Sequence, residues 1–237
     1  MKEIGILDAG ILDICLQAFE DSPVIMIQFP EVFGIVGLPN QSGIDGLNKA
    51  KNRLPEKFYG TVIGNSLPFF QMESEAYRPD YLPSEDFGKL LEGSIIRIKI
   101  GEDWDNTSAC RNGTHQALLY QESPIRDLFR GFEAAFEPLA DAGIFLGHSY
   151  SSPFCTSANL SGHPDGSITN LEAARAFGKA AGIPLMVRCS MESSGEKGSF
   201  PVLSLEKSRI VVEREGPGLQ EIISRFEPGL FQFRNRQ

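Results

Sequence analysis

Lys51 and Arg53 are the first residues of the chain whose types and spacing suit phosphate chemistry. They lie at the end of a predicted helix that runs from Ser42 to about Lys51. Leu54 precedes Pro55 and therefore favours extended backbone, so the chain straightens and both cations can converge on one ligand. A lysine point charge beside a planar arginine fork is well matched to polyphosphate. The alternative is that both cations only complement the negative end of the helix dipole.

A second polar group is the run of hydroxyl and amide side chains from Cys155 to Pro164, which follows an apolar strand. If Ser157 and Asn159 are extended, they share one face. Their hydroxyl and carboxamide can then hydrogen-bond an oxyanion or a nucleotide. A polar turn, whose serine and asparagine side chains bond the nearby backbone, fits the same residues equally well.

The composition is that of a folded globular protein. The chain has 237 residues, 41% of them hydrophobic, which is enough for a substantial core. Charged residues at 22% and aromatic residues at 10% disfavour collagen-like, coiled-coil and disordered proteins. A net charge of −9 argues against a protein that binds nucleic acid with its whole surface, although a local basic cleft remains compatible with it.

Membrane and secretion signals are absent from the sequence. No segment has 18 uninterrupted apolar residues, and Lys2, Glu3, Asp8 and Asp13 interrupt the apolar positions near the amino terminus. The four cysteines are widely spaced and form no Cys-x-x-Cys pair. We therefore expect reduced thiols, a cytoplasmic location and no membrane contact. The three histidines, His115, His148 and His163, have no metal-ligand spacing, so we expect surface or hydrogen-bonding roles and no protein metal site.

Helices and strands alternate along the chain, which predicts a single α/β domain over residues 1–237 with its core at about 24–214. The expected architecture is a twisted, open mixed sheet with flanking helices. The predicted strands are Val24–Phe29 and Val32–Val36 (two strands or one broken strand), Tyr59–Ile63, Ser94–Ile100, Ala117–Tyr120, Ile144–Leu146, Leu185–Arg188, Pro201–Leu205 and Arg209–Arg214. The further predicted helices are Ser84–Leu91, Pro124–Leu139 with Ser123 as its cap, Leu171–Ala181 with a Thr169/Glu172 capping box, and Pro217–Phe226. Asn65–Pro83 lacks periodicity and is expected to be a loop or a lid.

The two polar groups together resemble the paired signature of the YrdC-like proteins, whose best-known members are threonylcarbamoyl-adenylate synthases. Lys51-x-Arg53 is followed about a hundred residues later by Thr156-Ser157-x-Asn159-x-Ser161-Gly162-x-Pro164, which is the more specific half. Phe29-Pro30 and Phe33-Gly34-Ile35 resemble the family's Phe-Pro entry and Tyr-Gly-Leu turn. The resemblance spans roughly residues 24–214.

The resemblance implies an ATP-dependent reaction. Family members condense L-threonine, bicarbonate and ATP into threonylcarbamoyl-adenylate and pyrophosphate, for the modification of an adenosine in tRNA. It implies that Lys51 and Arg53 hold the ATP phosphates, and that Thr156, Ser157 and Asn159 bind nucleotide and carboxylated substrate. It also implies that Ser199 and Arg214 correspond to the family's late serine and arginine. Mg²⁺ would be carried mainly by the phosphates, since no dedicated carboxylate cage is present in the sequence.

Departures from the family pattern fall at the amino-acid end of the site. The family's Pro-Thr-Asp-Thr stretch is shortened here to Pro30-Glu31-Val32, and Phe33 replaces the usual tyrosine. Glu92-Gly93-Ser94 stands where Pro-Gly-Pro is common. Threonine specificity is therefore in question more than ATP binding. The alternatives are a carbamoyl-phosphate-dependent enzyme that forms carbamoyl-adenylate, and a non-catalytic module of the same fold that binds nucleotide or RNA.

Overall fold

The computed structural model of the chain describes residues 1–52, 58–73, 79, 87–101, 108–145, 147–159, 166–189 and 196–234. Arg53 and the Ser161-Gly162-x-Pro164 part of the second motif lie outside these ranges, as does most of the predicted Asn65–Pro83 loop after residue 73.

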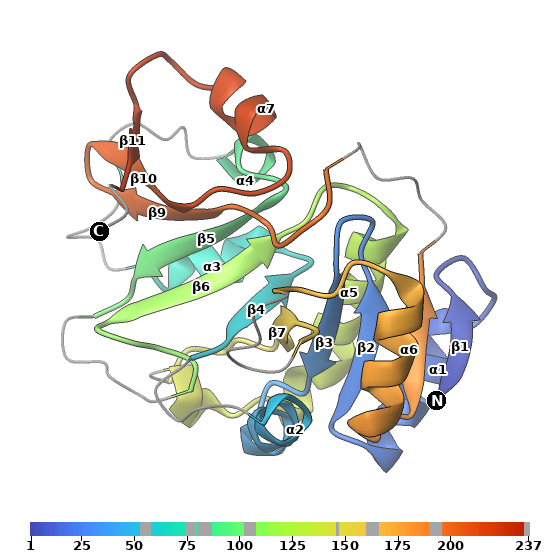
Figure 1. Cartoon of the computed structure of the whole chain (residues 1–237). Coiled ribbons are helices and arrows are strands. Elements are labelled where there is room, and N and C mark those ends of the chain that lie inside the picture. The colour runs from blue at the N-terminus through green and yellow to red at the C-terminus, as the bar shows by residue number, and fades with distance from the viewer. Residues whose placement is uncertain are drawn as a thin grey trace.

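The described strands form one mixed sheet in the order β1-β8-β2-β3-β7-β4-β6-β5-β9-β10-β11, which confirms the predicted α/β class (Figure 1). β4 runs parallel to β6, whereas β3 and β4 both run antiparallel to β7. The strands are β1 (Lys2–Gly5), β2 (Val24–Gln28), β3 (Phe33–Gly37), β4 (Gly60–Ile63), β5 (Ser94–Lys99), β6 (Thr114–Leu119), β7 (Phe154–Ser157), β8 (Leu185–Arg188), β9 (Val202–Glu206), β10 (Arg209–Arg214) and β11 (Phe231–Phe233).

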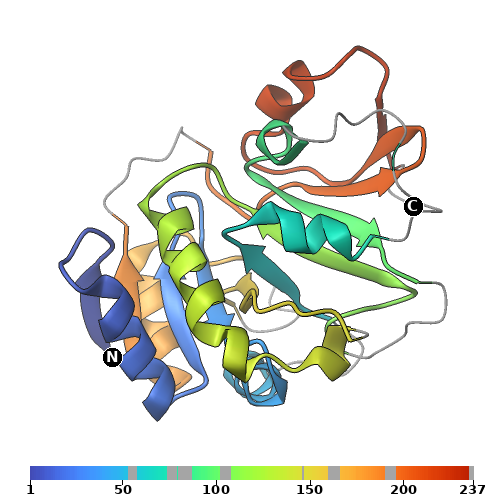
Figure 2. The same ribbon diagram turned by 180° about the vertical axis from the view of Figure 1, so that it is seen from behind.

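Helices cover both faces of the half of the sheet that contains β2 and β3. α1 and α5 lie on one face, and α2 and α6 lie on the other (Figures 1 and 2). Each of these four helices packs through one stripe of buried residues that recur at helical spacing. The helices are α1 (Ile11–Asp21), α2 (Gln41–Lys51), α3 (Ser66–Gln71), α4 (Phe87–Leu90), α5 (Pro124–Phe136), α6 (Leu171–Ala180) and α7 (Leu219–Ser224).

Local signals explain the best-predicted elements. Ser123 caps α5 by accepting a hydrogen bond from the amide of Arg126, and Pro124 occupies the first turn, as predicted. The apolar segment around Pro30 forms two strands, β2 and β3, which pair antiparallel in a hairpin.

Three local predictions are wrong. Ser66–Gln71 is a helix inside the predicted loop; at six residues it is too short to show a period, and it buries Phe69. Ile144 and Phe145 belong to a 3₁₀ helix rather than a strand, because Asp141 accepts a hydrogen bond from the amide of Gly143 and turns the chain.

The third error concerns the start of α6. Asn170, not Thr169, is the cap, and its side chain accepts from the amide of Ala173 at 2.8 Å. Glu172 instead pairs with Arg175 on the next turn.

Candidate functional site

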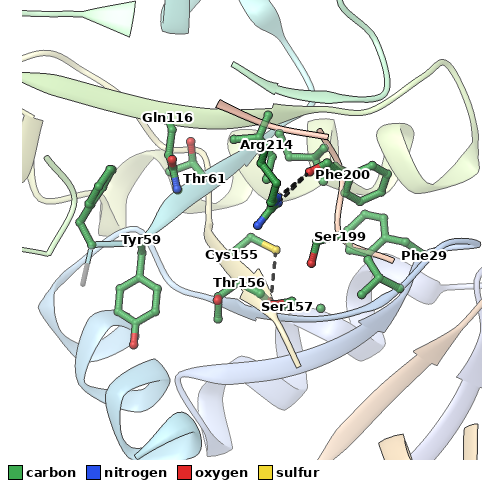
Figure 3. A pocket seen from close by; sticks show the side chains of 16 residues that line it. Phe29, Tyr59, Thr61, Gln116, Cys155, Thr156, Ser157, Ser199, Phe200 and Arg214 are labelled. Carbon is green, nitrogen blue, oxygen red and sulfur yellow. Dashed lines mark hydrogen bonds between the residues drawn. The ribbon is translucent and has the colours of Figure 1, made fainter. Parts of the chain in front are cut away.

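A pocket of about 190 Å³ opens where β3, β4 and β7 face β5, β6 and the end of β10 (Figure 3). Its lining combines an apolar part with cationic, amide and hydroxyl groups. The lining residues are Phe29, Val32, Gly34, Phe58, Tyr59, Gly60, Thr61, Ile95, Gln116, Leu118, Cys155, Thr156, Ser157, Ser199, Phe200 and Arg214. None of these described residues is acidic, so the pocket favours an anionic or neutral ligand.

Arg214, the last residue of β10, points its guanidinium into the pocket toward Cys155 (Figure 3). Its Nη2 and Nε donate to the Phe200 carbonyl at 2.7 and 3.3 Å. Burial, and then the nearby positive charge of Arg97, lower the pKa of Arg214. An arginine stays protonated in proteins, so the site holds a desolvated positive charge that an anion would stabilise.

β7 supplies the opposite wall. Ser157, at its end, donates its hydroxyl to Asn159 Oδ1 at 3.0 Å. Two residues earlier, Cys155 places its sulfur against the pocket (Figure 3). Burial raises the pKa of the Cys155 thiol to about 12, so this cysteine is a neutral wall residue near pH 7 rather than a nucleophile.

Lys51 joins the two halves of the sequence signature. It is the last residue of α2 and is only 3% exposed. Its Nζ donates to the Ser157 carbonyl at 2.5 Å and to Asn159 Oδ1 at 2.8 Å. The ammonium group, the hydroxyl and the carboxamide therefore form one cluster beside the pocket.

Ser199 lies on the same side of the pocket as Phe29, and its hydroxyl is 2.5 Å from that of Ser167 (Figure 3). The structure thus brings together six of the seven predicted site residues. Thr156, Ser157, Ser199 and Arg214 line the pocket, and Lys51 and Asn159 adjoin it through Ser157. The seventh, Arg53, lies outside the described part of the chain.

Sequence reasoning missed the wall formed by β5 and β6. Gln116 faces the pocket, and its Oε1 accepts a hydrogen bond from Arg97 Nε at 2.9 Å. Arg97 also lies 5.7 Å from the centre of the Phe58 ring. The sequence carries one signal for this wall, which is the alternation of side chains along β5. It predicts one solvent-exposed face of the strand and places Arg97 on the same face as Ile95.

A separate polar cluster lies behind the pocket wall. His115 is fully buried; its Nδ1 donates to the Ala109 carbonyl at 2.8 Å, so Nε2 is left to accept from Thr61 at 3.3 Å. The Tyr150 hydroxyl lies 2.6 Å from Thr61 Oγ1 and completes the chain of bonds. Burial lowers the pKa of His115 to about 4, and burial raises the pKa of Tyr150. Both side chains are neutral at pH 7, and His115 has the hydrogen-bonding role expected for it.

Metal-binding clusters and membrane-spanning helices can be sought only among the described residues. Within the described ranges, no three His, Cys, Asp or Glu side chains gather closely enough to hold a metal ion. Over the same residues, no helix has both the length and the apolar character needed to cross a bilayer. The expected Mg²⁺ on the ATP phosphates remains a prediction.

Comparison with solved structures identifies the fold. P. abyssi Sua5 complexed with L-threonine superposes with a TM-score of 0.65 at 15% identity, over 99% of this chain and 63% of that one. Full-length HypF in its phosphate- and nucleotide-bound form gives 0.57 at 13%, over 87% and 29%. E. coli YciO gives 0.56 at 10%, over 90% and 93%. No protein-family model and no curated protein sequence matches the chain.

The chain therefore has the YrdC-like fold, and the resemblance read from its motifs is confirmed at the level of the fold. It spans less than two thirds of the length of Sua5. Fold likeness at this identity does not transfer an activity, which depends on the residues at the site.

Proposed function

We propose that the protein forms a carbamoyl-adenylate from ATP, bicarbonate and an amine, either threonine or a relative of it, and releases pyrophosphate. The amine and bicarbonate condense to a carbamate with loss of water. A carbamate oxygen then attacks the α-phosphorus of ATP, and the bond from that phosphorus to the β-phosphate oxygen breaks. A role in tRNA modification and a cytoplasmic location belong to the same proposal.

The observation that supports this proposal is the meeting of Lys51 with Ser157 and Asn159 beside a pocket that contains Arg214. The two halves of the signature lie more than a hundred residues apart in sequence, yet their side chains bond directly. Adenylyl transfer needs phosphate charges neutralised and the attacking oxygen aligned, rather than a protein nucleophile. This donor set, which has no nearby carboxylate among the described lining residues, fits ATP phosphates with their own Mg²⁺.

The residues have separable roles in this reaction. Lys51 would neutralise phosphate charge, as would Arg53 if it converges on the same ligand. Ser157 and Asn159 would donate to nucleotide or carbamate oxygens. The Ser157 hydroxyl would exchange its bond to Asn159 Oδ1 for a bond to substrate, and Asn159 would donate through Nδ2, while Lys51 holds Asn159 Oδ1 and the Ser157 carbonyl together.

The test is bicarbonate-dependent pyrophosphate release from ATP by the purified protein, with each amino acid supplied separately. We expect Lys51→Ala to weaken ATP binding and to lower kcat/KM by at least about 10²-fold, because charge-assisted phosphate contacts are lost. Lys49→Ala is the matched control, since this exposed lysine lies on the same helix. Equal ATP affinity in the wild type and in Lys51→Ala would remove the phosphate role.

The first alternative is a carbamoyl-phosphate-dependent enzyme that forms carbamoyl-adenylate, and the fold likeness to HypF favours it. Turnover with carbamoyl phosphate and none with bicarbonate selects this reaction. The second alternative is a non-catalytic module that binds nucleotide or RNA. Absence of pyrophosphate release with every substrate, together with RNA binding that falls steeply with salt, selects that one.

A further inference from the structure

We infer that the pocket binds the amine substrate as an aliphatic α-amino acid, with its carboxylate held between Gln116 and Arg214. This inference rests on the proposed function and names the substrate class of the same site. Gln116 becomes the residue that recognises the carboxylate, and Arg97 becomes a positioning residue behind it.

The orientation of the Gln116 carboxamide is fixed by its neighbour. Arg97 has only donors, so the atom 2.9 Å from its Nε must be the Gln116 oxygen. The amide nitrogen of Gln116 therefore turns into the cavity (Figure 3). Among the described residues the structure records no acceptor for this nitrogen, so it is available to a ligand.

Gly60 makes this arrangement possible. A Cβ at position 60 would lie 2.9 Å from the Gln116 carbonyl oxygen, 3.0 Å from its Cγ and 3.3 Å from its Nε2. A side chain at this position would push Gln116 away from the strand and out of the pocket. The glycine therefore allows β4 to approach the carboxamide closely.

The charges favour a carboxylate. Burial lowers the pKa values of both Arg97 and Arg214, and the charge of Arg97 lowers that of Arg214 further. The desolvated guanidinium of Arg214, which lines the pocket, gains from an anion beside it. A carboxylate is planar and has two oxygens, so it can accept from the Arg214 guanidinium and the Gln116 amide together.

The rest of the pocket favours an apolar side chain. Next to Gln116 along the sheet are Ile95 and Leu118, and beyond them are Phe29, Val32 and Phe200. The neighbour of Val32, Glu31, accepts a hydrogen bond from the Tyr120 hydroxyl and does not line the pocket.

Three hydroxyls beside the pocket already have protein partners. Ser157 bonds Asn159, Ser199 bonds Ser167, and Thr61 bonds Tyr150. A hydroxyl on the substrate would therefore have to compete with these three bonds, and the apolar side chains of the pocket would offer it no partner in place of water.

The size of the cavity separates an amino acid from a nucleotide. About 190 Å³ is below the range of roughly 300–1,000 Å³ that is usual for drug-sized ligands. One small amino acid suits this volume better than a nucleoside triphosphate does. A phosphate of ATP is the other anion that could bind between Gln116 and Arg214. The KM values of Gln116→Ala for valine and for ATP distinguish the phosphate from the carboxylate.

Valine and threonine provide the decisive comparison, because a methyl group in one replaces a hydroxyl in the other. We expect kcat/KM for valine to exceed that for threonine by about 10²-fold in the pyrophosphate assay, the usual discrimination of an apolar pocket against such an isostere. Equal or better turnover with threonine would overturn the inference. Calorimetric titration of valine without ATP measures binding separately. If valine binds but no amino acid releases pyrophosphate, the proposed function fails, and the assignment of an aliphatic amino acid as the ligand of the pocket stands.

Variants test the carboxylate contact. We expect Gln116→Ala to raise KM for valine by about 10-fold, with KM for ATP unchanged, because one hydrogen bond to a charged group is lost. Gln232→Ala, at an exposed position on β11, is the matched control. A rise in KM for ATP instead would assign the pocket anion to phosphate and contradict the inference.

Arg97→Met tests positioning. It should raise KM for valine in the same direction as Gln116→Ala, and the double variant should cost no more than Gln116→Ala alone, since Arg97 acts through Gln116. A purely structural role for Arg97 predicts additive effects, and that outcome would contradict the positioning assignment.

Discussion

His115 and Gln116 are neighbours on β6, yet they serve two different regions of the molecule. Side chains alternate across a strand, so His115 enters the buried cluster with Thr61 and Tyr150 while Gln116 faces the pocket. In the buried cluster, both ring nitrogens of His115 have a protein partner. In the pocket, the amide nitrogen of Gln116 has no recorded acceptor within the described chain.

The difference separates polar groups that hold the fold from polar groups that can hold a ligand. A buried donor without a partner is costly, so a cluster whose members bond one another is already satisfied. A pocket group that keeps a donor free, beside a desolvated charge such as Arg214, gains when a ligand arrives. Stability measurements should therefore respond to the first region, and binding measurements to the second.

The largest effect on stability is expected from His115→Ala. Removing the ring opens a cavity among Phe69, Phe145 and Tyr150, whose rings pack around it, and leaves the Ala109 carbonyl without its donor. We expect the free energy of unfolding to fall by about 3–5 kcal/mol. Chemical denaturation measures this change.

Gln116→Ala is the matched control in the same experiment, because it alters the next residue on the other face. We expect it to change the free energy of unfolding by less than about 1 kcal/mol. Equal losses in both variants would break the distinction between the two regions.

The next largest effect is a pH dependence of stability that originates in His115. Its pKa is about 4 in the folded protein, below the ordinary value of 6.5, so the unfolded chain binds the extra proton first as the pH falls. The neutral His115 contributes its full share to the free energy of unfolding above pH 6.5. This contribution, about 3 kcal/mol, is lost as the pH falls from 6.5 to 4. The measurement is the free energy of unfolding against pH for the wild type and for His115→Gln. Parallel curves would show that His115 does not titrate with folding.

Much of the fold is predictable because local signals and tertiary packing agree. The Ser123 cap and the apolar stripe of α5 are visible in the sequence, as is the alternation of β5. The predictions fail where an element is short. α3 has six residues and the 3₁₀ helix at Ala142–Phe145 has four, so neither shows a period, and burial of Phe69 and Phe145 decides their conformation.

The site is predictable only where a motif marks it. Lys51, Ser157 and Asn159 belong to the signature, and their side chains meet in the structure. Gln116 and Arg97 carry no motif. The predicted strand begins at Ala117 whereas β6 begins at Thr114, so the three polar residues of β6, Thr114, His115 and Gln116, lie outside the predicted strand. A shift of three residues at a strand end thus hid one wall of the pocket.

The smallest effect on stability, with a large effect on binding, is expected for Arg214→Ala. The variant loses the bonds to the Phe200 carbonyl, but it also removes a desolvated charge that Arg97 repels. We therefore expect the free energy of unfolding to change by less than about 1 kcal/mol, while valine affinity falls by about 10²-fold. Calorimetry and denaturation on the same preparation test both values, with Arg209→Ala, an exposed position on the same strand, as the control. A loss of several kcal/mol of stability with unchanged affinity would place Arg214 among the groups that hold the fold, and the pocket would then lack the charge that distinguishes it from the His115 cluster.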